Sequence, residues 1–138
     1  MSVGRICTRE VDLAELEENV VTVAQRMRDQ RVGTLVILDA SKKPIGLVTD
    51  RDLVVRVVAA GRDPHAERVR EAMTPDPKVV SEESPIESAL GLMRAGNFRR
   101  LPVVDREGRL VGILSLDDVL ALLAEESGHI GRVVERKG

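Results

Sequence analysis

An internal repeat limits the folds open to this chain more than any other feature of the sequence. At a shift of 66 residues, identical residues coincide as Thr8 with Thr74, Met27 with Met93, Leu35 with Leu101, Asp39 with Asp105, Gly46 with Gly112 and Asp52 with Asp118. The match runs without a gap over residues 3–60 and 69–126. Two copies are too few for a solenoid, which usually needs at least three. We therefore expect two repeats related by a pseudo-two-fold axis, at residues 1–62 and 63–127, followed by a charged tail at 128–138.

Each copy shows the same order of predicted elements. Apolar residues at helical spacing predict a first helix from Val20, Val23, Ala24 and Met27 in copy one and from Ile86, Ala89, Leu90 and Met93 in copy two. Two β-branched runs around a polar turn predict a hairpin, over 34–38 and 45–49 in copy one and 101–104 and 110–115 in copy two. A last helix is expected over 50–61 and 116–126. The expected fold class is α/β, with β-α-β-β-α repeats whose small sheets pack against helices.

The second copy carries signals for both ends of its first helix. Ser84 is predicted as the N-cap, with Pro85 in the first turn and Glu87 completing a capping box. Gly96 and Asn97 predict the end of this helix.

The last helix of each copy has apolar residues on more than one face. These residues are Leu53, Val54, Val55, Val57 and Val58 in copy one and Val119, Leu120, Leu122 and Leu123 in copy two. Such helices are normally buried on more than one side, and one small domain cannot cover them fully. We therefore expect a homodimer, because a two-fold association would bury the surplus.

Composition argues against several classes of function. Phe98 is the only aromatic residue, so the stacking platforms of RNA and single-stranded DNA binders are missing. The net charge is -2 and basic residues are interleaved with acidic ones, so the sequence offers no basic stripe to a nucleic-acid backbone. No segment approaches the roughly 18 consecutive apolar residues of a membrane span. Cys7 is the single cysteine and no signal peptide is recognised, so a cytoplasmic location is expected.

The motifs at corresponding places of the two copies resemble the CBS domain pair, also called a Bateman module. Copy two contains Ala72-Met73-Thr74, Arg100-Leu101-Pro102-Val103-Val104-Asp105 and Gly112-Ile113-Leu114-Ser115-Leu116-Asp117-Asp118, and copy one contains Gly46-Leu47-Val48-Thr49-Asp50-Arg51-Asp52. Copy one departs from the pattern where Thr34-Leu35-Val36 replaces Arg-Leu-Pro, and where Cys7 replaces Met. The resemblance covers nearly the whole chain. It implies a stand-alone regulatory module that holds an adenosyl ligand between its repeats.

A Thr/Ser-x-x-Asp element stands where the hairpin ends and the last helix begins, as Thr49 with Asp52 and Ser115 with Asp118. The first N–H groups of a helix are unpaired and favour an anion, so a phosphate fits there. An ionised Asp one turn further can accept both ribose hydroxyls. The same spacing also describes a capping box, which needs no ligand. Spacing alone favours the cap, whereas the family resemblance implies nucleotide-contacting residues.

Further positions are expected at the ligand site because of the same resemblance. Arg99 and Arg100 correspond to a basic pair that meets ligand phosphate, although a solvated edge would explain them equally well. Gly46 and Gly112 allow close backbone approach and leave room for an adenine ring. Copy one has Gly33-Thr34 where copy two has Arg99-Arg100. We therefore expect one phosphate site, at Thr49 and Asp52, and a second site that holds nucleoside-like or uncharged ligands or stays empty.

The predicted function is that of an adenine-nucleotide sensor that signals to an unidentified protein partner. AMP, ADP or ATP is the expected ligand, with S-adenosylmethionine or NAD as alternatives and no obligatory cofactor. The competing hypothesis is a ligand-independent dimerisation or adaptor module. No catalytic residue is expected, because His65 and His129 belong to no repeat motif. No metal site is expected either, because helix-start solvation explains the carboxylates of Asp50, Asp52, Asp117 and Asp118.

Overall fold

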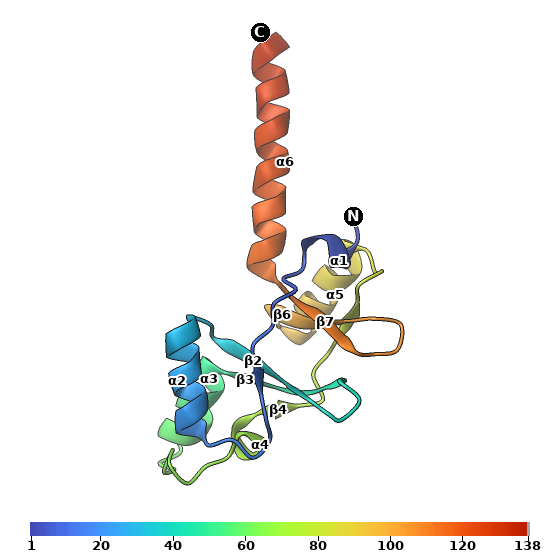
Figure 1. Cartoon of the computed structure of the whole chain (residues 1–138). Coiled ribbons are helices and arrows are strands. Elements are labelled where there is room, and N and C mark those ends of the chain that lie inside the picture. The colour runs from blue at the N-terminus through green and yellow to red at the C-terminus, as the bar shows by residue number, and fades with distance from the viewer. Residues whose placement is uncertain (138) are drawn as a thin grey trace.

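Two small sheets form the centre of the molecule, and short helices pack on their outer sides (Figure 1). The computed structural model describes the backbone of residues 1–137 and the side chains of residues 1–128. One sheet has the order β1-β2-β3-β4, from strands Leu13–Ala14, Thr34–Leu38, Pro44–Thr49 and Thr74–Pro75. The other has the order β5-β6-β7, from strands Val80–Ser81, Arg100–Val104 and Leu110–Ser115. The predicted α/β class and both predicted hairpins are confirmed.

The two hairpins are built in the same way, which explains an aspartate that repeats in the sequence. Oδ1 of Asp39 accepts hydrogen bonds from the amides of Ser41 and Lys43, at 2.8 and 2.9 Å. Oδ1 of Asp105 accepts from the corresponding amides of Glu107 and Arg109, at 2.9 and 3.0 Å. Each aspartate thereby closes the tight turn of its hairpin through its own side chain.

The first helix of copy two ends as predicted, at Gly96 and Asn97, but its start differs from the prediction. Helices α2 (Val20–Gln30) and α5 (Ile86–Gly96) end in left-handed residues, Arg31 and Asn97. The predicted N-cap Ser84 is wrong, because Pro85 has extended backbone and α5 starts after it. The amide of Ile86 instead donates to the carbonyl of Met1 at 3.1 Å, so a distant backbone segment satisfies the helix end.

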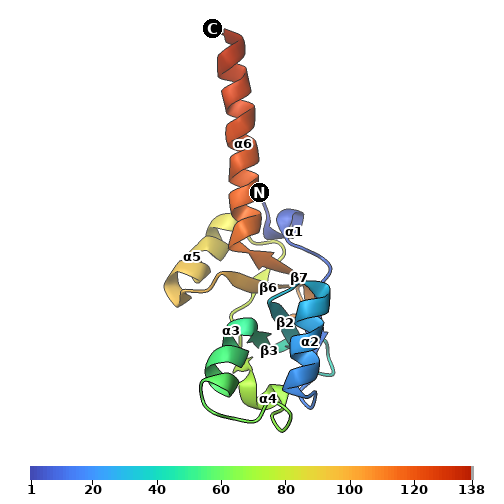
Figure 2. The ribbon, with the colours of Figure 1, turned by 90° about the vertical axis from the view of Figure 1, so that its left-hand side faces the viewer.

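The last helices of the two repeats differ from each other. In copy one, α3 (Asp50–Leu53) continues into a π-helical segment, η1 (Val54–Val58), and the chain turns at Gly61, which has a φ of 71°. In copy two, α6 runs from Leu116 to Lys137 and projects from the body of the molecule (Figures 1 and 2). The predicted end near residue 126 is therefore wrong. Glycines inside a helical stretch weaken it but do not end it, so the tail continues α6.

The opening segment of each repeat packs against the other repeat. Helix α1 (Val3–Ile6) buries Val3 in the core of the second repeat, and Thr8 exchanges 2.9 Å backbone hydrogen bonds with Ile113. Helix α4 (Val69–Ala72) lies in the core of the first repeat, and β4 pairs with β3. Each core is therefore completed by the other repeat, and the ranges 1–62 and 63–127 divide the sequence but not the packed units.

Each sheet has its own apolar core. The first contains Ala14, Val20, Val23, Met27, Leu35, Ile37, Val48, Leu53, Val57, Val69 and Ala72. The second contains Val3, Val80, Ile86, Ala89, Met93, Leu101, Val103, Leu114 and Val119. The predicted first-helix residues Val20, Val23 and Met27 and their counterparts Ile86, Ala89 and Met93 all lie in these cores. The hairpin ends that carry the Thr/Ser-x-x-Asp elements thus rest on packed apolar layers.

Candidate functional site

Both Thr/Ser-x-x-Asp elements form capping boxes. Asp52 N–H donates to Thr49 Oγ1 at 3.0 Å, and Thr49 N–H donates to Asp52 Oδ2 at 3.0 Å. In copy two, the same pair of bonds joins Ser115 and Asp118, both at 3.1 Å. The cap is therefore made entirely by atoms of this chain. Each box uses one carboxylate oxygen, so the second oxygen of each aspartate is left for another partner.

The second oxygen of Asp52 lies beside the opening strand of the other repeat. Thr74 Oγ1 is 3.4 Å from Asp52 Oδ1, and Arg56 Nε is 3.8 Å from the same oxygen. Arg56 also donates to the Met73 carbonyl at 2.5 Å and to Thr74 Oγ1 at 3.4 Å. Because a guanidinium can only donate, Thr74 accepts from Arg56 and donates to Asp52. This chain of contacts ties Asp52 to the segment that enters copy two.

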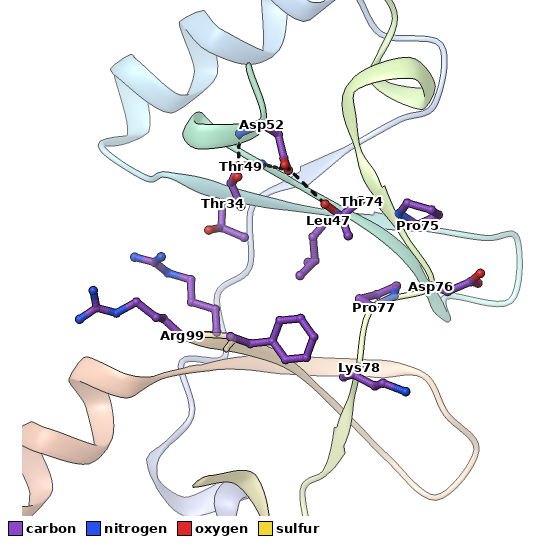
Figure 3. A pocket seen from close by; sticks show the side chains of 12 residues that line it. Thr34, Leu47, Thr49, Asp52, Thr74, Pro75, Asp76, Pro77, Lys78 and Arg99 are labelled. Carbon is purple, nitrogen blue, oxygen red and sulfur yellow. Dashed lines mark hydrogen bonds between the residues drawn. The ribbon is translucent and has the colours of Figure 1, made fainter. Parts of the chain in front are cut away.

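A cavity of about 400 Å³, called cavity one below, lies between the two hairpins (Figure 3). Copy one contributes Thr34, Leu47, Thr49 and Asp52, and copy two contributes Thr74, Pro75, Asp76, Pro77, Lys78, Phe98, Arg99 and Arg100. The structure thus brings four of the predicted site residues together from opposite repeats. Their arrangement offers a carboxylate and a hydroxyl on one side, a guanidinium pair on the other and apolar walls between them.

A smaller cavity of about 240 Å³, called cavity two, occupies the equivalent place on the other side of the pseudo-axis. It is lined by Thr8, Glu10, Val11, Asp12, Arg31, Val32, Gly33, Thr34, Arg100, Ile113, Ser115 and Asp118. Most of these residues stand 66 positions from a residue of cavity one. Thr34 and Arg100 correspond to each other in the repeat, and both border both cavities.

The two cavities differ in charge. Cavity one has three cations, Lys78, Arg99 and Arg100, against two acids, Asp52 and Asp76. Within the described side chains, no salt bridge engages any of the three cations. Their positive charge is therefore available to an anion. This arrangement is consistent with the expected contrast between Gly33-Thr34 and Arg99-Arg100.

Cavity two has the opposite balance. It contains three acids, Glu10, Asp12 and Asp118, against two cations, Arg31 and Arg100. Arg31 adopts a left-handed backbone with a φ of 57°, a conformation that favours Gly or Asn. The excess of carboxylates makes cavity two a poorer place for a phosphate than cavity one.

The structure does not bring Gly46 or Gly112 into either cavity. A Cβ on Gly46 would lie 2.6 Å from Met73 Sδ, and a Cβ on Gly112 would lie 2.8 Å from Cys7 Sγ. The space beside each glycine is filled by the segment that enters from the other repeat. The lack of a side chain at these glycines therefore allows the exchange of opening segments, and the expected place for an adenine ring beside them is occupied by Met73 and Cys7.

Sequence reasoning missed eight of the twelve lining residues of cavity one, and three of these, Thr34, Phe98 and Lys78, matter most for its chemistry. Phe98 packs against Gly96, where a Cβ would come 2.0 Å from the Phe98 ring. Copy one has Gln30 and Val32 at the equivalent positions, so this aromatic wall belongs to one cavity only. The two copies differ in sequence at Gly96 and Phe98, and this difference is the signal that could have indicated the aromatic wall.

Thr34 is buried, with 8% of its surface exposed. Its Oγ1 is the one buried side-chain oxygen or nitrogen without a hydrogen-bond partner among the described side chains. It pairs in register with Thr49 across β2 and β3, so both hydroxyl groups lie on one face of the sheet. A buried polar atom without a partner is unusual in a folded protein.

Other chemistry-bearing residues lie outside the two cavities or form no cluster. Burial raises the pKa of the Cys7 thiol above its usual value, and its sulfur packs on Gly112. His65 is exposed and its carbonyl accepts from Asn19 Nδ2 at 2.5 Å, whereas the side chain of His129 lies outside the described residues. Among the residues that the structure describes, no three His, Cys, Asp or Glu side chains gather as metal ligands. No described helix is long and apolar enough to cross a membrane.

Two repeats that exchange their opening segments, with one cavity on either side of a pseudo-axis, define a tandem α/β module. The chain belongs to the CBS domain family, whose model matches residues 3–59 and 69–125. Uncharacterized protein MK0525 of Methanopyrus kandleri is 37% identical over 120 residues, which cover 87% of this chain. This chain spans 61% of the length of that relative.

Solved structures of CBS proteins share the fold. PAE2072 from Pyrobaculum aerophilum, complexed with AMP, is 27% identical with a TM-score of 0.80, covering 93% of this chain and 99% of that one. A hexameric CBS-CP12 protein from bloom-forming cyanobacteria is 29% identical with a TM-score of 0.78, covering 87% of this chain and 69% of that one. The predicted family and the predicted pair of repeats are confirmed.

Proposed function

We propose that this chain is a regulatory module that binds an adenine nucleotide in cavity one and signals to a protein partner. The observation that carries the proposal is the meeting of Thr49 and Asp52 from one repeat with Arg99 and Arg100 from the other. A ligand held by both sides favours the relative position of the repeats in which both sides reach it. A ligand can shift such an equilibrium only by its difference in affinity for the two arrangements.

The chemistry of cavity one matches the three parts of a nucleotide. Oδ1 of Asp52, which has accepting capacity beyond its contact with Thr74, accepts ribose hydroxyls, and the guanidinium pair binds phosphate oxygens in a bidentate manner. Leu47 and Phe98 offer an apolar wall to the base. The AMP bound to PAE2072 supports an adenine nucleotide as the ligand class. AMP, ADP and ATP are the first candidates, and S-adenosylmethionine and NAD are alternatives.

Cavity two has a different ligand preference in this proposal. Its acids Glu10, Asp12 and Asp118 repel phosphate, so it takes a nucleoside-like or uncharged ligand or remains empty. The module then has one strong nucleotide site per chain.

Self-association is the second part of the proposal. Exposed apolar residues, Val54, Val55, Val58, Leu120 and Leu123, lie on η1 and on α6, the last helices of the two repeats. Val58 is 67% exposed and borders an apolar groove of about 310 Å³ between α2 and η1. A homodimer would cover these residues, and the hexameric CBS-CP12 structure supports self-association.

The competing function is a ligand-independent dimerisation or adaptor module. The capping boxes favour it, since the cap alone explains the Thr-x-x-Asp spacing. The unpaired cations of cavity one and the unsatisfied hydroxyl of Thr34 oppose it, because capping explains neither. We propose no catalytic activity and a cytoplasmic location, with neither nucleic acid nor membrane as partner.

Thermal unfolding with added ligands tests the proposed function. AMP, ADP, ATP, adenosine, S-adenosylmethionine and NAD are added separately, and inorganic phosphate serves as the control for a simple anion. A ligand at one hundred times its dissociation constant stabilises the folded state by about 2.7 kcal/mol, which is a rise of several degrees in a domain of this size. A melting temperature unchanged by all nucleotides would support the adaptor.

A further inference from the structure

The hydroxyl of Thr34 sits at a point where the two repeats should be equivalent but are not. Arg100 is the residue of copy two that corresponds to Thr34, and each of these two residues borders both cavities. In copy two, Arg100 pairs in register with Ser115, just as Thr34 pairs with Thr49 in copy one. Copy one thus carries a short neutral hydroxyl where copy two carries a long cation.

Folding alone does not account for this hydroxyl. Thr34 lies in β2 with 8% of its surface exposed, and its neighbours in that strand are fully buried apolar residues, Leu35 and Val36. Its Oγ1 has no hydrogen-bond partner in the described structure. A buried hydroxyl without a partner destabilises a folded protein, and valine has nearly the same shape without that penalty. The strand would therefore be more stable with valine at this position.

The surroundings of the hydroxyl indicate what it meets. Thr49, directly across the strand pair, uses its own oxygen as the helix cap for Asp52. Arg100 and Arg99 border the same cavity from the second repeat, and neither has an ion-pair partner among the described side chains. An anion held by the two arginines is thus within the same cavity as an unused O–H donor.

We propose that Thr34 Oγ1 binds a phosphate oxygen of the ligand in cavity one, together with Arg99 and Arg100. This inference rests on the proposed nucleotide-binding function and assigns a specificity role to a residue outside the Thr/Ser-x-x-Asp elements. The bound phosphate accepts the hydroxyl proton and so satisfies the orphaned group. Thr34 also keeps cavity two poor in positive charge, because an arginine at this position would add a cation there.

The substitution Thr34→Val distinguishes a binding role from a structural role, because the two roles predict opposite patterns of change in melting temperature and AMP affinity. The variant is expected to unfold at the same temperature as the wild type or higher, since it removes an unsatisfied buried polar group. Its affinity for AMP, measured by calorimetry, is expected to fall about tenfold, which corresponds to one hydrogen bond of ordinary strength to a charged group. Its affinity for adenosine is expected to stay unchanged. A structural residue would instead lose melting temperature and leave AMP affinity intact.

Two further variants complete the test. Thr34→Ser keeps the hydroxyl and is expected to retain AMP affinity within about twofold, although it loses a buried methyl group and some stability. Thr22→Val makes the same chemical change on an exposed face of α2, outside both cavities. It is expected to change neither the melting temperature nor the affinity for AMP.

The failures of the two proposals are distinguishable. If the wild type binds none of the nucleotides, the proposed function itself is wrong. If the wild type binds AMP and Thr34→Val binds it equally well, only the role of Thr34 is wrong. An equal loss of AMP and adenosine affinity would overturn the assignment to phosphate.

Discussion

The hydroxyl of Thr74, at the start of copy two, lies 3.4 Å from Oδ1 of Asp52 in copy one. The other carboxylate oxygen, Oδ2, accepts the Thr49 amide at 3.0 Å. Asp52 is therefore held at both oxygens, once by its own repeat and once by the other. Because Oδ1 still has accepting capacity, a ribose hydroxyl that reaches it also contacts the joint between the repeats.

Removal of the Asp52 charge tests its proposed role in ribose recognition. Asp52→Asn keeps an oxygen that can accept the Thr49 amide but loses the charge, whereas Asp52→Ala loses the cap as well. Both are expected to bind AMP more weakly, by about 1–3 kcal/mol for one lost acceptor to a buried hydroxyl. Asp118→Ala is expected to affect only a ligand of cavity two. If both Asp52 variants keep full nucleotide affinity in calorimetry and only melt earlier, the elements are caps.

The hydroxyls of the same elements have an expected role in phosphate binding. Thr49→Ala should weaken AMP binding more than adenosine binding, and it should also destabilise the protein by about 0.5–2 kcal/mol because an N-cap is lost. Ser115→Ala carries the same stability penalty without an effect on cavity one. Equal AMP affinity in Thr49→Ala, after correction for its folded fraction, would contradict the phosphate role.

The arginine pair should account for the salt dependence of binding. The double variant Arg99→Ala, Arg100→Ala is expected to weaken the one strong site selectively and to reduce its sensitivity to ionic strength. The matched control, Arg5→Ala with Arg94→Ala, removes two exposed positive charges that line neither cavity. Calorimetry of the wild type should give one salt-sensitive site per chain. Two equal sites, or an isotherm unaltered in the double variant, would assign these arginines to the solvated surface.

The exposed apolar residues of the last helices predict a dimer that charge can disrupt. Val58→Lys and Leu120→Lys each place a cation on a side chain that is at least half exposed, so the folded monomer tolerates them. Sedimentation at tens of micromolar should show a dimer for the wild type and a shift toward monomer for the variants. A wild-type monomer at that concentration would contradict the prediction.

An ion pair in copy one predicts how stability changes with pH. Arg26 donates to Glu18 at 2.5 and 3.0 Å, and this hydrogen bond holds the pKa of the Glu18 carboxyl below its ordinary value. A lowered folded-state pKa stabilises the protein above the unfolded pKa of about 4.3, and this contribution is lost as pH falls through the folded pKa. Glu18→Gln should be less stable than the wild type at neutral pH. In denaturant titrations from pH 7 to pH 3, the difference in unfolding free energy between the wild type and Glu18→Gln should become smaller as the pH falls. A difference that stays constant over this range would contradict the predicted coupling between Glu18 ionisation and stability.

Much of the fold could be predicted from local sequence. The hairpins at residues 34–49 and 100–115 follow from β-branched runs around a turn closed by Asp39 or Asp105. The capping boxes at Thr49 and Ser115 follow from a three-residue spacing. These features depend on residues within a few positions of one another, so a sequence displays them directly.

The tertiary structure alone decided how the two repeats combine. The exchange of the opening segments put Met73 beside Gly46 and satisfied the amide of Ile86 with the carbonyl of Met1. These contacts join residues far apart in the chain, and no spacing rule specifies them. The same holds for cavity one, because its charge depends on side chains that the two copies contribute from opposite sides. The repeated sequence by itself determined two similar units and their local caps; the long-range packing of one unit against the other made their cavities different.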